Sequence, residues 1–388
     1  MSQEDELYFF SGGGSGGHVT PLVAVAEELK KRCPQARVHA VVHRGDSGGV
    51  NRVVKDSGAI DEVHEIFAGK LRRYHGEGLK QLLDIKEMLK NLRDVFYVIV
   101  GFMQSLYLVL RYKPKALFMR GGYVGVPLGF AARLLHRPYL THDSDAVASL
   151  ANRLIARGAS AHAVGLPKEN YRYNQSRTHH VGIPVNKAYT VINSDLRETA
   201  RQELKLPHDA EVVLVTGGGL GARSLNRTAA AVLLRLLKSR PRLFIIHIAG
   251  KKLQEEVEHL YRNTSRSLVY GFTNELRLLS EASDVVITRA GATALTEFSI
   301  QKQAMIIVPN NQLTGGHQLQ NARVYQENSA AVLVDEDENT QEVLYKTVNE
   351  LLNNPAERGR LGESAEQLVK KDAAENVVDI LIKLHHKK

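Results

Sequence analysis

Two stretches of the chain share one pattern: a short apolar run, a glycine-rich loop and an amphipathic segment. In the first stretch these parts are residues 7–11, 12–18 and 19–31, and in the second they are 212–216, 217–221 and 222–237. An apolar run of five residues is too short for a helix, whereas apolar residues three and four apart favour one. Each stretch therefore predicts the strand, turn and helix of a parallel α/β sheet. Their repetition predicts two such domains in tandem.

A polar and charged segment at 190–206 lies between the two stretches. A boundary within 186–195 gives a first domain of residues 1–186 and a second of 187–365. Residues 365–384 predict a last helix, because Leu368, Val377, Leu381 and Leu384 fall on one face.

Residues 284–322 have the order of elements expected of an anion site. The apolar run 285–287 predicts a buried strand, Gly291 a turn, and residues 292–300 a helix. The free amide groups and the dipole at the start of such a helix favour an anion. Glu297 does not bind an anion itself, so we expect it to take sugar hydroxyls, as an acidic residue does in dinucleotide folds. A surface glutamate in an ion pair is the alternative.

The first glycine-rich loop matches two phosphate-binding motifs incompletely. Its glycines at 12, 14 and 17 fit G-x-G-x-x-G, but the next strand ends in His43-Arg-Gly45 without the acidic residue that a ribose needs. The P-loop pattern is also broken, because His18 and Val19 stand where lysine and serine or threonine are required.

The charge balance indicates an anionic partner. The chain has 51 Lys and Arg against 42 Asp and Glu, a net charge of +9. Phosphorylated small molecules and anionic membranes fit this charge. No nucleic acid is expected, because aromatic residues make up only 6% and neither zinc-finger spacing nor an RNP motif is present. Cys33 is the only cysteine and the start is acidic, so we expect a reducing compartment and no signal peptide.

A basic segment at 70–93 precedes an uncharged one at 96–110. The uncharged part is shorter than the ~20 residues that cross a bilayer, so a peripheral membrane surface is expected. A core helix beside a solvated charged helix is the alternative. The basic residues of this surface are Lys70, Arg72, Arg73, Lys80, Lys86 and Lys90.

Motifs over residues 7–385 resemble, in order and spacing, those of the MurG family of UDP-N-acetylglucosamine (UDP-GlcNAc) transferases. They are Gly13-Gly-Ser-Gly-Gly-His18, Gly121-Gly-Tyr-Val-Gly125, His142-Asp-Ser-Asp145 with Asn152, Gly182-Ile-Pro-Val185, Gly217-Gly-Gly-Leu-Gly-Ala-Arg223, and Arg289-Ala-Gly-Ala292 with Glu297, Gln318 and Asn321. The resemblance implies a GT-B fold, in which two Rossmann-like domains face a cleft and the last helix, 366–388, returns to the first domain. It implies no cofactor.

The resemblance also implies that the two domains bind different substrates. The second domain would bind UDP-GlcNAc, with Glu297 on the ribose, the backbone near Thr273 on the uracil, and the 290–294 turn on the diphosphate. The donor-binding residues are Gly219, Thr273, Ala292, Thr293, Glu297, Gln318 and Asn321. The first domain would bind lipid I, a polyprenyl-diphosphate acceptor, at the cytoplasmic face of the membrane. The acceptor-binding residues are Ser15, Gly16, Gly17, Gly122, Tyr123 and Asp143.

Transfer with inversion needs a base for the attacking hydroxyl and stabilisation of the departing diphosphate. Helix amides supply the second without a metal, and the sequence contains no D-x-D motif and no visible cluster of metal ligands. His18 is the candidate base, and Asp145 or Asp143 is the rival. A purely cationic role of His18 toward phosphate is the alternative.

Four positions depart from the family pattern. His142-Asp-Ser-Asp145 replaces His-Glu-Gln-Asn, Gly219 replaces a serine, Asn186 replaces an arginine, and Thr293-Ala294 replaces Leu-Thr. A divergent enzyme or an altered acceptor fits these changes, so a GT-B transferase for another lipid or a natural product is one alternative. The two glycine-rich loops leave a dehydrogenase open, and the missing hydroxyl at Gly219 leaves a binding protein without catalysis.

Overall fold

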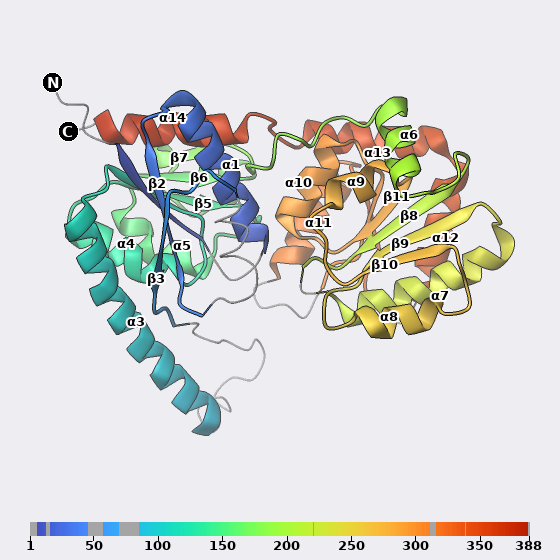
Figure 1. Ribbon diagram of the computed structural model, residues 1–388, viewed down its shortest axis with the longest axis horizontal. Helices are drawn as coiled ribbons and strands as arrows, with labels where there is room; N and C mark the ends of the chain where they lie inside the picture. The colour runs from blue at the N-terminus through green and yellow to red at the C-terminus, as the bar shows by residue number, and fades with distance from the viewer. Residues whose placement is uncertain are drawn as a thin grey trace. The chain divides into compact units, whose positions relative to one another are not determined.

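The computed structural model describes residues 6–12, 16–45, 57–69, 85–219, 221–310, 316–337 and 339–386, with backbone alone at 16–19, 85–91 and 385–386. It divides into two compact units (Figure 1). Unit 1 comprises Met1–Asn186 and Lys370–Lys388, and unit 2 comprises Lys187–Val369. Each unit is described by itself.

Unit 1 is built on a seven-stranded parallel sheet with the order β3-β2-β1-β4-β5-β6-β7. The strands are β1 Leu7–Ser11, β2 Arg37–His43, β3 Glu62–Ile66, β4 Ala116–Met119, β5 Tyr139–Asp143, β6 Ala161–Val164 and β7 Thr178–His180. Side chains alternate between two cores. Phe10 faces α1 (Gly16–Arg32) and α14 (Ala373–His386), and Phe9 faces α3 (Ile85–Tyr112), α4 (Gly125–Leu134) and α5 (Leu150–Ile155).

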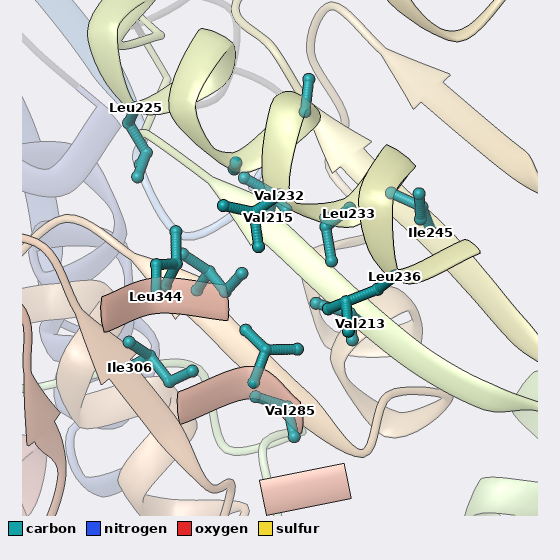
Figure 2. Packing of buried hydrophobic residues seen from close by; sticks show 14 of the residues in the cluster. Val213, Val215, Leu225, Val232, Leu233, Leu236, Ile245, Val285, Ile306 and Leu344 are labelled. Carbon is teal, nitrogen blue, oxygen red and sulfur yellow. The ribbon is translucent and has the colours of Figure 1, made fainter. Parts of the chain in front are cut away.

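Unit 2 is built on a six-stranded parallel sheet with the order β10-β9-β8-β11-β12-β13. The strands are β8 Glu211–Thr216, β9 Leu243–Ile248, β10 Ser267–Tyr270, β11 Val285–Thr288, β12 Met305–Ile307 and β13 Val332–Leu333. On one face α7 (Arg223–Ser239), α8 (Gln254–Tyr261) and α12 (Thr340–Asn353) cover Val213, Ile245 and Val285 (Figure 2). The other face carries α6 (Ser194–Glu203), α9 (Leu276–Glu281), α10 (Ala292–Ile300), α11 (His317–Glu327) and α13 (Pro355–Gln367).

In both sheets the order in which the chain adds strands reverses at the first strand of the unit. The first strand of unit 1, β1, pairs with β2 and β4, and the first strand of unit 2, β8, pairs with β9 and β11. In open parallel sheets ligands bind beyond the carboxyl ends of the strands at this topological switch point. The two tandem Rossmann-like domains expected from the sequence are therefore confirmed.

Several local predictions were wrong. β3 was not expected, because its sequence Glu-Val-His-Glu-Ile lacks an apolar run. Helix α1 begins at Gly16, so Gly16 to His18 lie in its first turn and not in the loop. Helix α5 begins at Leu150, and its N-cap is Ser149, whose side chain accepts from the backbone N–H of Asn152.

The expected last helix is two helices, α13 and α14, separated by residues 368–372. Ala365 packs in the core of unit 2, whereas Val377 and Leu381 pack in the core of unit 1. The break therefore falls where the chain passes from one unit to the other. No glycine or proline in the sequence marks it.

Helix α3 is one continuous helix of 28 residues. Its segment Leu92–Tyr112, 21 residues long, could cross a membrane by length and composition alone, so the expectation that this region is too short was wrong. One face of α3 nevertheless packs against the rest of unit 1. At Gly101 a Cβ atom would lie 1.8 Å from the carbonyl oxygen of Phe67, and the backbone N–H of Phe67 donates to Gln104 Oε1 at 2.8 Å.

Candidate functional site

The carboxyl edge of the unit 2 sheet gathers the segments that the sequence singled out. The loop 217–221 follows β8 and the loop 289–291 follows β11, so the two loops flank the switch point. Thr273 comes after β10, and Gln318 and Asn321 lie on α11 after β12. Because all six strands are parallel, these segments share one edge.

The glycine-rich loop after β8 requires glycine at one position. Gly221 has a φ of +74°, and a Cβ atom there would lie 2.1 Å from the carbonyl oxygen of Ala249. At Gly219 the one atom of the described residues within 4 Å of an added Cβ is Cε2 of Phe272, 3.9 Å away. Gly219 is exposed at the switch point, as expected for a donor-binding residue, whereas Gly221 holds the loop against the end of β9.

Arg289 fixes the second loop of the switch point. Its guanidinium is buried and donates to Glu336 at 2.9 and 3.1 Å, to the Val308 carbonyl at 2.9 Å and to Ser224 Oγ at 2.8 Å. Burial raises the pKa of Glu336, but the bonds from Arg289 and Ser224 outweigh it and hold that pKa below its usual range. This network joins the ends of β11 and β12 to the start of α7. The sequence marked Arg289 as part of a motif without assigning it this role.

Helix α10 presents its N-terminus to the same edge. Its N-cap residue is Gly291, and no side chain in the described part of the chain caps it. Gly291 is exposed and Ala292 half-buried, whereas Thr293 is buried. The first amides of α10 are thus directed toward an open edge, which suits a diphosphate.

Glu297 lies in the second turn of α10 and is buried, with 6% of its surface exposed. The alternative of a surface ion pair is therefore wrong. Burial raises the pKa of Glu297 to about 8, although a hydrogen bond from the Tyr189 hydroxyl lowers it. A buried carboxyl group that can accept several hydrogen bonds suits the hydroxyl groups of a ribose.

Other donor-site residues already have partners in the protein. The side-chain amide of Asn321 is buried and donates to the Ala290 carbonyl at 3.0 Å, so it supports the loop before α10. Gln318 Oε1 accepts from the backbone N–H of Asn310 at 3.0 Å. Thr273 Oγ1 accepts from the backbone N–H of Glu275 at 2.9 Å. The backbone near Thr273, which was the expected contact to uracil, is next to the exposed ring of Phe272.

The carboxyl edge of unit 1 brings together part of the expected acceptor site. Gly16 and Gly17 lie in the first turn of α1 after β1, and Gly122 and Tyr123 follow β4 across the switch point. Gly122 has a φ of +81°, and the Tyr123 ring contacts the His43 ring edge to face at 5.3 Å. The prediction for Ser15 lies outside the described residues, and of His18 only the backbone is described.

The acidic residues after β5 differ in their surroundings. Asp143 is buried, and its carboxylate accepts from the Ser149 N–H at 2.8 Å and from the Tyr173 hydroxyl at 2.7 Å. Burial raises its pKa, while these bonds lower it. Asp143 therefore holds the 144–149 loop in place. Asp145 is half-buried and attracts the buried guanidinium of Arg120, whose pKa burial lowers to about 10.

The sequence missed two features. Tyr189, in the segment expected to contain the domain boundary, donates to Glu297. The second feature is a group of potential metal ligands in unit 1, His39, Glu62 and His64, which the sequence alone did not show. His39 and Glu62 are far apart in the sequence, and the pairing of β2 with β3 brings them together.

Comparisons with known proteins agree with this arrangement. Residues 8–164 match the N-terminal domain and residues 212–377 the C-terminal domain of glycosyltransferase family 28. The chain is 32% identical over 382 residues to the UDP-N-acetylglucosamine–N-acetylmuramyl-(pentapeptide) pyrophosphoryl-undecaprenol N-acetylglucosamine transferase of Desulforudis audaxviator, covering 96% of this chain and 97% of that one. It is 27% identical over 380 residues to the protein of that name from Borreliella afzelii, covering 97% of each. The crystal structure of Acinetobacter baumannii MurG superposes with a TM-score of 0.70 at 25% identity, covering 98% of this chain and 100% of that one.

The two glycines of the loop after β8 predict opposite responses to substitution. Gly219→Ser meets only ordinary contact and adds a hydroxyl at the switch point, so we expect an unchanged melting temperature and a several-fold tighter binding of UDP, measured by calorimetry. Gly221→Ala forces a positive φ and a backbone clash, and should destabilise the protein by roughly 1–3 kcal/mol. Equal stability of Gly221→Ala and the parent would contradict this account of the loop.

Proposed function

Because the chain belongs to the MurG family of glycosyltransferases, we propose that it transfers GlcNAc from UDP-GlcNAc to lipid I, forming lipid II with inversion at the anomeric carbon. The observation that carries this proposal is the buried carboxyl group of Glu297 inside the helix whose open N-terminus meets the switch point of unit 2. A diphosphate on the α10 amides places the adjoining ribose within the reach of a carboxylate in the next turn.

The donor is held by groups with different tasks. The amides at the start of α10 and the loop 217–221 bind the diphosphate, and their partial charges stabilise the UDP that departs. Glu297 accepts hydrogen bonds from the ribose hydroxyls, and these replace the bond that it accepts from the Tyr189 hydroxyl in the free protein. Gln318 and Asn321 are the proposed contacts to the GlcNAc hydroxyls, with the Asn321 carboxamide held in position by Ala290.

The acceptor hydroxyl needs a base. In the proposed reaction His18 removes the proton from that hydroxyl, the oxygen attacks the anomeric carbon of GlcNAc, and the bond from this carbon to UDP breaks. His18 lies in the first turn of α1, at the carboxyl edge of the unit 1 sheet, which is the edge where Gly122 and Tyr123 lie. Asp145 is the rival base, and its side chain is half-buried and near Arg120.

A transfer assay tests the reaction and its base. Lipid I and UDP-GlcNAc should give lipid II and UDP, and the rate should be greater than with other polyprenyl or diacylglycerol acceptors. His18→Ala should lower the turnover number by about 10² or more, because general base catalysis contributes that much, without changing the affinity for UDP-GlcNAc. Asp145→Asn is the comparison. Faster transfer to another acceptor would refute the assignment of lipid I, and full turnover by His18→Ala would refute its role.

Binding of UDP-GlcNAc should depend on pH through Glu297. The pKa of its carboxyl group is about 8 in the free protein, and ribose hydroxyls favour the ionised form, so binding releases a proton. The dissociation constant should therefore rise by up to about tenfold per pH unit as pH falls below 8. UDP-GlcNAc, unlike UDP, has no phosphate that titrates near neutral pH, which makes calorimetry with it decisive.

Two glutamine variants distinguish the specific effect of Glu297 on binding from the general effect of removing one negative charge. Glu297→Gln should bind about ten- to a hundred-fold more weakly at pH 9, because hydrogen bonds to a charged group are lost, and its affinity should not change with pH. Glu350→Gln, at an exposed position of α12, should behave as the parent does. A parent whose affinity is constant between pH 6.5 and 9 would remove the assignment.

We also propose that the exposed face of α3 lies in the cytoplasmic surface of the membrane, where a polyprenyl acceptor is anchored. The exposed side chains are spaced three or four residues apart along the helix: Leu92, Val95, Phe96, Ile99, Met103, Tyr107 and Leu110. They continue onto α4 through Phe130 and Leu134, and a groove of roughly 610 Å³ between these helices is lined mainly by apolar side chains. Arg93, Arg111 and Arg133 are exposed near this face, which suits anionic headgroups.

Helix α3 fits a surface position better than a spanning one. Its second face holds the buried carboxyl group of Asp94 and the close contact of Gly101 with Phe67, so protein and not lipid covers that side. The predicted basic residues Lys70, Arg72, Arg73 and Lys80 lie outside the described residues. The side chains of Lys86 and Lys90 are not described either.

Three serine substitutions on this face test the membrane proposal. The variant Phe96→Ser, Ile99→Ser and Met103→Ser removes apolar side chains that are 56 to 61% exposed, so the fold should be unaffected. Its partition onto vesicles with anionic lipid, measured by co-sedimentation, should fall by at least about tenfold. The matched variant Leu154→Ser, Val191→Ser and Val343→Ser, also at exposed positions, should partition as the parent does. Equal partition of all three proteins would overturn the proposal.

A further inference from the structure

A cluster of two histidines and one glutamate lies in unit 1, in the layer between the sheet and α3. His39 is on β2, and Glu62 and His64 are on β3, with His39 and Glu62 as direct neighbours across the strands. The rings of Phe9 and Tyr112 surround the two imidazoles at centroid distances of 4.9 to 5.8 Å. The cluster is near the beginning of the strands, and the proposed transfer chemistry lies at their carboxyl ends.

Three potential ligand atoms converge within this cluster. His39 Nδ1 lies 3.0 Å from His64 Nε2 and 3.5 Å from Glu62 Oε2. Ligands on a tetrahedral zinc ion, with bonds of about 2.0–2.2 Å, are separated from one another by roughly 3.3–3.5 Å. The spacing of these atoms is thus close to that of ligands around one ion, and small rotations of the side chains complete the geometry.

Hydrogen bonding within the cluster is incomplete. The carboxylate of Glu62 lies 3.5 Å from His39 and 3.6 Å from His64, which is too far for a good hydrogen bond. His39 Nε2 is buried and has no hydrogen-bond partner among the described residues. Between the three described side chains, the imidazole pair at 3.0 Å makes the one short contact. The Glu62 carboxylate thus has no short bond from either imidazole.

The cluster is also accessible through one of its three side chains. The side chain of Glu62 is 43% exposed, whereas those of His39 and His64 are 1% and 10% exposed. An ion can thus enter past Glu62, and water can fill the remaining coordination positions.

We propose that His39, Glu62 and His64 form a binding site for a divalent transition metal, with Zn²⁺ as the expected ion. Two imidazoles and one carboxylate are ligands of borderline softness, and such a set binds zinc in preference to magnesium or calcium. Bound here, the ion joins the edge strand β3 to β2. It also reaches α3, since the hydroxyl of Tyr112, the last residue of that helix, lies 3.4 Å from Glu62 Oε1. The role we infer is structural, at the base of the helix with the exposed apolar face.

Metal binding to the full chain, without an affinity tag and after treatment with a chelator, tests the site directly. Zn²⁺ should bind with one equivalent per chain in the assigned site, and Co²⁺ should give the visible ligand-field bands of a four-coordinate ion. When the free Zn²⁺ concentration is a hundredfold above the dissociation constant, the melting temperature of unit 1 should rise by about 5 °C. None of these measurements depends on transferase activity.

Matched variants locate the ion. Glu62→Gln and His64→Gln, at positions that are not fully buried, should each weaken binding by at least about tenfold and change the Co²⁺ spectrum. Glu65→Gln, exposed on the same strand, and His136→Gln, exposed after α4, should bind as the parent does. The proposal is overturned if the parent binds no Zn²⁺, or if Glu62→Gln and His64→Gln retain the parent's affinity.

Discussion

The parallel pairing of β8 with β11 is the constraint on which the proposed donor site depends. These strands are not consecutive in the sequence. Their pairing makes the sheet extend in opposite directions on either side of β8, so the loops that follow β8 and β11 diverge. Among the described residues no side chain caps the first amides of α10 at this divergence, where the diphosphate is proposed to bind. Arg289 stabilises the loop after β11, because it donates hydrogen bonds to Glu336 and to Ser224 at the start of α7.

The burial of Glu297 disfavours its charged form. A carboxylate inside a helix layer is poorly solvated, so the group is held in its neutral form up to a pH of about 8. Tyr189 supplies one hydrogen-bond donor, and in the proposed complex a ribose would supply two. Binding of the nucleotide would then stabilise the ionised carboxylate. Such a residue discriminates against ligands that lack hydroxyls in this place, because its desolvation is then uncompensated.

Much of this was predictable from sequence, and the failures have a common physical cause. Apolar runs such as 212–216 and the glycines after them are local signals, so the tandem Rossmann-like folds and the family resemblance were confirmed. β3 was missed because an edge strand with one covered face carries Glu and His where a central strand carries Val or Ile. The break between α13 and α14 and the cluster at His39 depend on which unit or strand a residue packs against, and no local pattern encodes this. Burial, too, is a tertiary property. It removed the surface alternative for Glu297 and gave Asp143 a role in holding a loop.

Helix α3 shows how one element serves two environments. Its sequence is apolar for most of its length, which by itself does not distinguish a core helix, a spanning helix and a surface helix. The close approach of Gly101 to Phe67 and the burial of Asp94 fix one face against protein, and the remaining apolar side chains are then left exposed on the other. Exposing so large an apolar surface to water is unfavourable, so the face requires a covering partner. In the proposed position α3 would rest on the membrane that holds a polyprenyl-linked substrate, and the enzyme's search for that substrate would then be limited to two dimensions.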